Sequence, residues 1–347
     1  MNLLIFKNST DFWVPTFLLG DNSYLTWPYL PLFFSIFFIM LTCSWLIISV
    51  IFLMIRIPKL HQNATWLLII TCGGWFESML GVLLILPYKY GIIRLSEDIF
   101  YGFESDKLLS LELSWKSAPL IVGSVLMWHY LGILNSGIIL FVVERSIATV
   151  LLSNYEIKPR KHIFIILLIT HQLSAIGLCL VCCFHMLPLN ILLSFNVIGF
   201  IIGLPLIFFL RCYNKTARNK LRLAENITKH SLTAKFQTEE NLRAMNIATT
   251  LATVAGIFDV FYIVIIILAT QRVPGAEIFF QATEIVLFFN PIFTLPAMIS
   301  SVSDWRAKFM EYLPISRLRI DPAHNPYAVR TVEEADFHFN QLHSLWV

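Results

Sequence analysis

The chain contains 347 residues, of which 57% are hydrophobic and only 14% are charged. Soluble domains carry about 25% charged residues, so this composition excludes an ordinary water-soluble fold and favours a protein whose solvent is a lipid bilayer. The formal net charge of +3 is too small to indicate a nucleic-acid partner. The first 28 residues lack the basic start and the apolar stretch of a cleavable signal peptide.

Uncharged apolar runs of about 20 residues recur along the chain, each long enough to cross ~30 Å of hydrocarbon. We therefore predict an all-α membrane protein, a seven-transmembrane helix bundle over residues 30–300, between an N-terminal segment 1–29 and a tail 301–347. One apolar stretch of 48 residues is too long for one helix, and we divide it at Pro188 and Asn190, the turn signal near its middle. The predicted spans lie near 30–55, 64–86, 119–143, 163–186, 191–210, 244–269 and 278–300.

Basic residues gather on one side of these spans, and loops rich in Lys and Arg remain in the cytoplasm. If the N-terminus is extracellular, the inner segments hold 19 of the 25 Lys and Arg residues. The basic loops 144–162 and 211–243 share that side only if two helices separate them, which supports the division near Pro188. We predict an extracellular N-terminus, a cytoplasmic C-terminus and a location in the plasma membrane. The near-neutral segment 87–118 is expected to form an ordered or partly ordered extracellular loop.

The third predicted span ends in a Glu-Arg pair, Glu144 and Arg145. A guanidinium is permanently charged and rich in donors, so a neighbouring group can hold it and a partner can receive it when it is released. Such a pair can act as a switch between two states. The alternative is an interfacial pair that extends toward water and anchors the helix. The dipeptide alone leaves both interpretations open.

The stretch that begins at this pair resembles the nematode serpentine receptor class epsilon family. Members of that family carry Glu-Arg at this place and a Tyr-Glu pair about ten residues later, which here are Glu144, Arg145, Tyr155 and Glu156. The number of spans, the long first outer loop and the very short second one are similar as well. The resemblance implies a chemoreceptor of sensory neurons, expected in their cilia, that signals through heterotrimeric G proteins.

The seventh predicted span contributes Asn290 and Pro291 to the resemblance. Three features depart from the wider rhodopsin-like receptors. The Glu-Arg pair is followed by Ser146 instead of an aromatic residue, the Asn-Pro pair is not followed by the usual tyrosine, and no cysteine pair is placed to join the third helix to the second outer loop. Activation rules of that wider group are therefore expected to transfer weakly.

Ionisable side chains in hydrocarbon are costly and usually face the interior of a bundle. Glu77 and Asn290 have similar depths above the inner boundary, so we predict that they share a polar cluster, either as a structural hydrogen bond or as part of a switch. His129, Asp259 and Glu284 lie at neighbouring depths in the outer half and predict a small-molecule pocket, although each can instead be a packed residue. The predicted switch and coupling residues are Glu77, Glu144, Arg145, Tyr155, Glu156, Asn290 and Pro291.

Two further features flank the predicted bundle. Asn8 belongs to the one Asn-x-Ser/Thr triplet on the predicted outer side and is the candidate glycosylation site. After the seventh span, residues 303–313 have the pattern of a short amphipathic helix that lies on the cytoplasmic leaflet. Cys212, beside the inner end of the fifth span, is either a lipidation site or an unmodified thiol.

Two other functions fit the sequence less well. An enzyme is not expected, because the common hydrolase, metalloprotease and phosphate-loop motifs are absent and His171 and His185 lack a metal-ligand pattern; no cofactor or metal is predicted. A ligand-gated channel or transporter is the alternative, with few deep carboxylates to form an ion pathway. We predict a G protein-coupled chemosensory receptor that binds a small molecule in its outer half and engages a heterotrimeric G protein through its basic inner loops.

Overall fold

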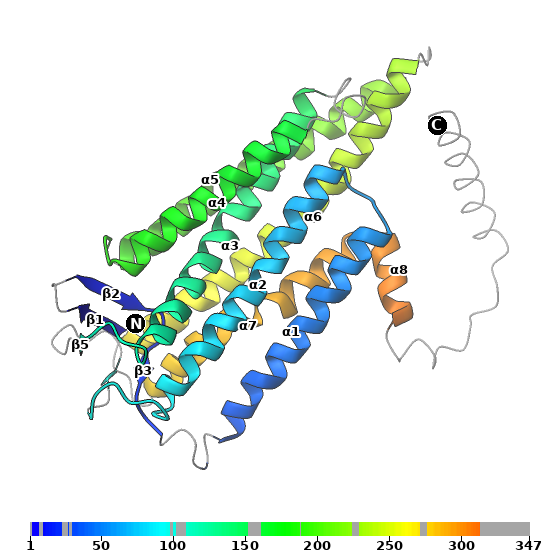
Figure 1. Cartoon of the computed structure of the whole chain (residues 1–347). Helices are drawn as coiled ribbons and strands as arrows, with labels where there is room; N and C mark the ends of the chain where they lie inside the picture. The colour runs from blue at the N-terminus through cyan, green and yellow to red at the C-terminus, as the bar shows by residue number, and fades with distance from the viewer. Residues whose placement is uncertain are drawn as a thin grey trace. The chain divides into compact units, whose positions relative to one another are not determined.

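The computed structural model of the chain divides into two units, one up to Arg306 and one from Ala307 onward. The first unit holds the helix bundle and the strands (Figure 1). The structure describes residues 2–6, 10–22, 27, 30–97, 100–101, 109–151, 161–187, 189–223, 229–270 and 276–312.

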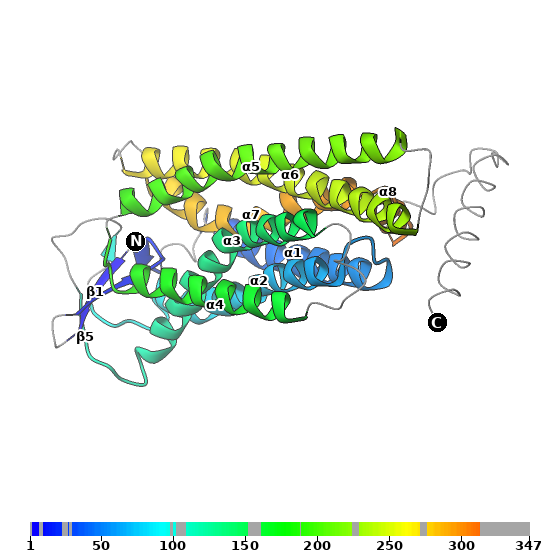
Figure 2. The same ribbon diagram turned by 90° about the horizontal axis from the view of Figure 1, so that it is seen from above.

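Seven long helices run up and down through the first unit, with consecutive helices antiparallel (Figure 1). The short helix α8 follows the last of them. Seen from above, α3 lies among the other helices, and it packs against α2, α4, α5 and α6 (Figure 2). The helices are α1 (Leu30–Arg56), α2 (Gln62–Lys89), α3 (Ala118–Val150), α4 (Lys161–Cys183), α5 (Leu189–Leu223), α6 (Lys229–Thr270), α7 (Ala276–Ser300) and α8 (Ser303–Tyr312).

The helices have the length and surface of membrane spans. Within the described residues, six of them, all the long ones except α5, contain a window apolar enough to cross a bilayer. Helix α5 completes the bundle, and its residues 189–210 carry no charged side chain. Large apolar side chains face outward, among them Phe38 at 72% and Leu41 at 71% exposure. Such a surface is unfavourable in water and suits contact with lipid.

Helices α5 and α6 continue well past the predicted spans. Helix α5 runs to Leu223 and α6 begins at Lys229, so the predicted inner loop 211–243 is largely helical. A hydropathy window finds the part of a helix that lies in hydrocarbon. The helix itself can continue into water as long as its residues favour helical structure. The loop is rich in Lys, Arg, Leu, Ala and Glu, which are good helix formers in water.

Helix α3 approaches its neighbours closely at glycines. A Cβ added at Gly132 would lie 2.6 Å from the Cα of Ala175 on α4. A Cβ added at Gly81 of α2 would lie 2.8 Å from the carbonyl oxygen of Gly123 on α3. Small residues let helix backbones approach in membranes, where close packing replaces the hydrophobic effect as the source of association.

Short strands cover one end of the bundle, which we call the strand end; the opposite end is called the Arg145 end (Figure 1). In one sheet β1 pairs antiparallel with β2 and parallel with β5, and in the other β3 pairs antiparallel with β4. The two sheets join the N-terminal segment to the α2–α3 connection, an arrangement that hydropathy did not predict. The strands are β1 (Asn2–Phe6), β2 (Asp11–Val14), β3 (Leu18–Leu19), β4 (Phe100–Tyr101) and β5 (Leu109–Leu111).

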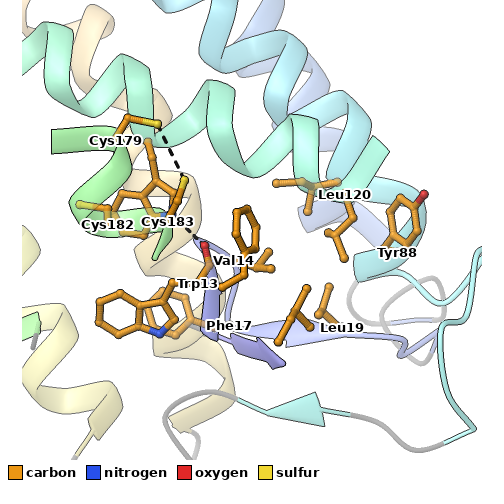
Figure 3. Close-up of a cluster of buried hydrophobic side chains, with 13 residues drawn as sticks. Trp13, Val14, Phe17, Leu19, Tyr88, Leu120, Cys179, Cys182 and Cys183 are labelled. Atoms are coloured by element: carbon orange, nitrogen blue, oxygen red, sulfur yellow. Dashed lines mark hydrogen bonds between the residues drawn. The ribbon is translucent and has the colours of Figure 1, made fainter. Parts of the chain in front are cut away.

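Residues 11–21, which we call the N-terminal plug, pack into the strand end as part of the core. Trp13, Val14 and Phe17 are each at most 5% exposed. They belong to a buried cluster with residues of α2, α3 and α4 (Figure 3). The indole Nε1 of Trp128 donates a hydrogen bond to the Trp13 carbonyl oxygen at 2.9 Å, which satisfies one polar atom of the inserted backbone.

The turn between α4 and α5 completes this end. His185 has a φ of +46°, a left-handed conformation that costs free energy in a residue with a side chain. Its ring packs against Trp13 with ring centroids 4.3 Å apart. The long apolar stretch therefore divides here into two helices, close to the predicted point; Pro188 itself lies outside the described residues.

The close approach of α3 and α4 can be tested with one methyl group. Gly132→Ala should lower the thermal unfolding midpoint of the detergent-solubilised protein, because the methyl group meets the backbone of Ala175. The control is Gly177→Ala on α4, where an added Cβ has no atom within 4 Å. Alanine favours a helix over glycine by ~1 kcal/mol, so the control should be neutral or stabilising. An unchanged midpoint in Gly132→Ala would contradict the close packing.

Candidate functional site

Arg145 lies near the end of α3 and is fully buried with its neighbour Glu144, both at 0% exposure. Its Nε donates to Glu144 Oε2 at 2.5 Å and its Nη2 donates to Glu144 Oε1 at 2.7 Å. This two-point pairing compensates much of the cost of burying the guanidinium charge. A buried side chain does not extend toward water, so the interpretation of this pair as an interfacial anchor does not fit the structure.

The third nitrogen of Arg145 connects α3 to α6. Its Nη1 donates to Glu240 Oε1 at 3.0 Å and to Asn241 Oδ1 at 3.2 Å. The side chain of Glu240 is 7% exposed, so this ion pair is poorly screened by water. One guanidinium therefore binds two carboxylates from different helices and holds α6 against α3.

A network of uncharged polar groups extends this contact to α5. Thr149 Oγ1 accepts hydrogen bonds from Asn241 Nδ2 at 3.2 Å and from Asn214 Nδ2 at 3.1 Å. One turn before Asn241, the Gln237 amide is fully buried, and neither of its polar atoms has a hydrogen-bond partner among the described residues. An unsatisfied buried amide costs about 1–3 kcal/mol, so this packing of α6 carries a penalty.

The segment between α1 and α2, residues 57–61, is a second attachment point for α6. Glu240 accepts a hydrogen bond from the backbone N–H of His61, and Arg243 Nη1 donates to the Lys59 carbonyl oxygen at 2.9 Å. Burial lowers the pKa of His61, and Arg145 lowers it further against the opposing effect of Glu240. The net effect favours the neutral form of His61 beside the ion pair.

The start of α8 contacts the same segment. Trp305 is 1% exposed, and its Nε1 donates to the Ile57 carbonyl oxygen at 3.0 Å. Lys59 pairs with Asp304, and its hydrogen bond lowers the pKa of that carboxyl. Helix α8 begins where the short amphipathic helix was predicted. Residues 57–61 thus link α6 to the first turn of α8.

At the strand end, Glu284 of α7 binds the N-terminal plug. Its Oε1 accepts hydrogen bonds from Thr16 Oγ1 at 2.8 Å and from the backbone N–H of Phe17 at 2.5 Å. Its Oε2 forms an ion pair with Lys89, at the end of α2, whose side chain is 5% exposed. The carboxylate is thereby shared by three parts of the chain.

A small cavity of about 30 Å³, partly open to solvent, lies beside this ion pair. It is enclosed by α1, α2, α3, α7 and the N-terminal plug. The charged residues in its wall are Lys89 and Glu284, and the remainder of the wall is mostly apolar. A mostly apolar lining with few polar anchors is typical of small-molecule sites, whereas the volume here is room for about two water molecules, so a ligand would have to widen the cavity. The lining residues are Pro15, Thr16, Ile36, Ile39, Val82, Ile85, Leu86, Lys89, Met127, Glu284, Ile285 and Phe288.

The other two residues of the predicted pocket are not in this lining. His129 Nδ1 lies 2.8 Å from Glu77 Oε1, so the two form a partly buried pair between α3 and α2. Asp259 of α6 is half-buried. The structure therefore assigns Glu284 to the cavity and places His129 in a different contact.

The predicted cluster of Glu77 with Asn290 is not formed. Glu77 pairs with His129, and the buried Oδ1 of Asn290 has no hydrogen-bond partner among the described residues. Depth along a helix can be estimated from 1.5 Å per residue, but two groups at one depth can face different neighbours. Pro291 follows Asn290 inside α7 and is buried.

Sequence reasoning found Arg145 and missed most of its partners. Glu240, which pairs with Arg145, was assigned to a predicted loop, and so was Lys89, which pairs with Glu284. Both lie beside charged or polar residues. The adjacent acidic pair Glu239 and Glu240, just before the sixth span, was the available signal for a partner of Arg145. Asn8, Tyr155 and Glu156 lie outside the described residues, whereas Cys212 is an exposed free thiol.

The bundle of seven long helices, with the buried Arg145 joining α3 to Glu240 of α6, is consistent with the G protein-coupled receptor class. Comparison with known proteins gives the particular group. The family model described as "Sre G protein-coupled chemoreceptor" matches residues 1–347, and the chain belongs to this family.

Individual relatives agree with the family. The chain is 25% identical to serpentine receptor class epsilon-38 of Caenorhabditis elegans, over 98% of this chain and 99% of that protein. It is 27% identical to serpentine receptor class epsilon-37 of the same organism, over 99% of both chains. The match to serpentine receptor class epsilon-29 is 27% over 99% of this chain and 100% of that protein. The predicted family and the seven-helix membrane fold are thereby confirmed.

The buried ion pair should be far more important for stability than an exposed one. Arg145→Met leaves the carboxylates of Glu144 and Glu240 without their shared cation, which should lower the free energy of unfolding by about 3 kcal/mol. The control is Arg218→Met, which removes a half-exposed pair with Glu239 at 3.5 Å and should cost under about 1 kcal/mol. Denaturant unfolding in detergent micelles measures both; equal losses would mean that the buried pair is not a special stabiliser.

Proposed function

We propose that the chain is a chemosensory receptor that binds a small molecule in the cavity at the strand end and activates a heterotrimeric G protein at the Arg145 end. The observation that carries the proposal is the buried Arg145, which joins α3 to α6 at the end of the bundle that bears most of the basic residues. In this assignment the strand end faces the outside of the cell, as the distribution of Lys and Arg favours. The proposed location is the plasma membrane, including sensory cilia.

The packing around Arg145 corresponds to a closed state in this mechanism. Opening requires α6 to leave Arg145 and also to leave residues 57–61, where Glu240 and Arg243 are bound. The buried and unsatisfied Gln237 amide, in contrast, destabilises the closed packing, because opening would hydrate it. The ion pair of Arg145 with Glu240 therefore stabilises the closed state, and the buried Gln237 amide destabilises it. Two opposing contributions leave a small free-energy difference between the states, which a ligand can shift.

A ligand shifts this equilibrium only if it binds the two packings with different affinities. A ligand in the cavity would provide such a difference by acting on two parts of its wall, α7, which carries Glu284, and the N-terminal plug, which binds Glu284. A change at Glu284 would alter the packing of α7 against α6, with which α7 shares a long contact. Roles in ligand recognition for His129 and Asp259, and in switching for Glu77, Asn290 and Pro291, stay predictions.

Opening would leave Arg145 free to contact the G protein, together with basic residues near the ends of α5 and α6. Those of α5 extend past the apolar segment as a charged helix. Tyr155 and Glu156 are proposed to contribute to coupling on the basis of the family resemblance alone.

Weakening the attachment of α6 should produce activity without ligand. Glu240→Gln removes one charge from the bond to Arg145 while keeping the shape of the side chain, so basal G protein activation should rise several-fold. The matched control is Glu239→Gln, whose carboxylate pairs with the half-exposed Arg218 instead. Gln237→Leu removes the buried unsatisfied amide and should act in the opposite direction, lowering basal activity.

The measurement is nucleotide exchange on a panel of G proteins, normalised to receptor at the cell surface. Equal basal activity in Glu240→Gln and Glu239→Gln would argue against the proposed switch. A ligand-evoked current with no nucleotide exchange would instead favour a channel or transporter.

The proposed direction in the membrane can be tested on intact cells. A tag before Met1 should be accessible to antibody and a tag after Val347 should become accessible only after permeabilisation, because 19 of 25 Lys and Arg residues lie in the predicted inner segments. The reverse pattern would place the Arg145 end outside the cell and would overturn the proposed coupling.

A further inference from the structure

Large apolar side chains are exposed just outside the helix ends at the strand end. Among the described residues, four of them lie three residues beyond a helix end: Trp27 precedes α1, Trp115 precedes α3, Ile92 follows α2 and Met186 follows α4. Their exposed fractions are 81%, 96%, 69% and 62% in that order. We call these four residues and Leu113, which is 79% exposed, the collar. Single exposed apolar residues are common on protein surfaces, but a repeated offset from four helix ends indicates a shared environment.

The offset fixes the height of the collar relative to a bilayer. Helices α1, α3 and α4 carry no charged residue in their turns at the strand end, so these ends fit the hydrocarbon boundary. Three residues of chain span at most ~10 Å. The headgroup region on each side of the hydrocarbon is roughly 5–8 Å thick. The collar therefore reaches the headgroup region of the leaflet at the strand end.

The segment that carries Trp115 is fixed by hydrogen bonds. Ser117 Oγ donates to the carbonyl oxygen of Glu112 at 2.8 Å, and the hydroxyl of Tyr88 donates to the carbonyl oxygen of Lys116 at 2.5 Å. The backbone is thus held on both sides of Trp115, whereas its side chain contributes almost nothing to the protein core. Fixed display of an indole to water is unfavourable, and tryptophan is enriched where a membrane meets water.

Exposed charged residues beside the collar suit zwitterionic headgroups. Lys116 and Arg94 lie within two residues of collar members, where they can bind lipid phosphate groups. The acidic residues Glu112 and Glu97 are exposed on the same two segments. These charges balance, so the collar requires no anionic lipid.

The collar is spread over different sides of the bundle. Helix α1 packs against α2 and α7, whereas α4 packs mainly against α3. The start of α1 and the turn between α4 and α5 lie at opposite edges of the strand end (Figure 1). A protein partner would have to bridge both edges, whereas lipid surrounds a bundle on every side. The distribution therefore favours a lipid surface over a protein partner.

We propose that the collar inserts into the headgroup region of the leaflet at the strand end, with Trp115 as its main anchor, and fixes the height of the bundle in the bilayer. The inference goes beyond the proposed function, because it requires neither a ligand nor a G protein. Because residues 112–117 lead directly into α3, the same contact sets the height of the helix that carries Arg145.

The height of Trp115 can be measured in nanodiscs of phosphatidylcholine that each hold a single copy of the full-length chain. A fluorophore is attached to Trp115→Cys in a Cys212→Ser background, because Cys212 is the exposed thiol among the described cysteines. The control is Thr10→Cys, at an exposed polar residue between β1 and β2. Relative to a water-soluble nitroxide, a nitroxide high on the lipid acyl chain should quench the Trp115→Cys label several-fold more strongly than the control label.

Equal ratios of lipid to water quenching at Trp115→Cys and Thr10→Cys would overturn the proposal. Protection of the Trp115→Cys label from both nitroxides would also overturn it, because protein would then cover the site. Labels at Trp27→Cys, Ile92→Cys and Met186→Cys should share the lipid preference of Trp115→Cys. Preferential quenching of these three by the water-soluble nitroxide would contradict a collar around the bundle.

The native indole gives an independent measurement, because an attached fluorophore can itself prefer lipid. The difference in tryptophan emission between the unmodified chain and Trp115→Phe isolates the emission of Trp115. Brominated lipid in the same nanodiscs should quench this difference emission, whereas a water-soluble quencher should have little effect. Difference emission that only the water-soluble quencher reduces would refute the insertion of Trp115.

Discussion

The buried charge of Arg145 sets the packing of the end of the bundle where it lies. A guanidinium cannot be buried without compensation, and Glu144 occupies only two of its nitrogens. The remaining nitrogen needs an acceptor, which Glu240 supplies from α6. Because the same carboxylate oxygen also accepts the N–H of His61, neutralising one charge fixes the positions of α3, α6 and the start of α2 together. Electrostatic compensation thus acts here as a structural restraint between distant segments.

At the strand end, buried backbone polar groups must likewise be compensated by hydrogen-bond partners. Irregular backbone is tolerated at membrane depth only where protein satisfies its polar atoms. The N-terminal plug meets this condition through Glu284, Trp128 and hydrogen bonds from Gly20 and Asp21 to the last residues of α2. It therefore behaves as part of the bundle, and the cavity is formed by helices and plug together.

The sequence predicted the features that depend on a single segment. Apolar runs predicted the spans, and the pair Glu144 and Arg145 stood out because charge at the end of a span is costly; the direction of the spans in the membrane stays a prediction from charge. It did not predict contacts between segments. Glu77 pairs with His129 instead of Asn290. Glu284 accepts a hydrogen bond from Thr16 and forms an ion pair with Lys89. Helix rotation and the pairing of short strands depend on tertiary packing, which one sequence does not encode as a local pattern.

The bond between the N-terminal plug and α7 has a consequence for biosynthesis. Thr16 and Glu284 are 268 residues apart in the chain. At translation rates of ~5–20 residues per second, roughly 15 to 50 s pass between the synthesis of these two residues. The apolar neighbours of the plug on α2, α3 and α4 are synthesised during this interval, whereas Glu284 is synthesised at its end. The polar bond to Glu284 is therefore the last contact of the plug to become available, and chains that end before α7 lack it.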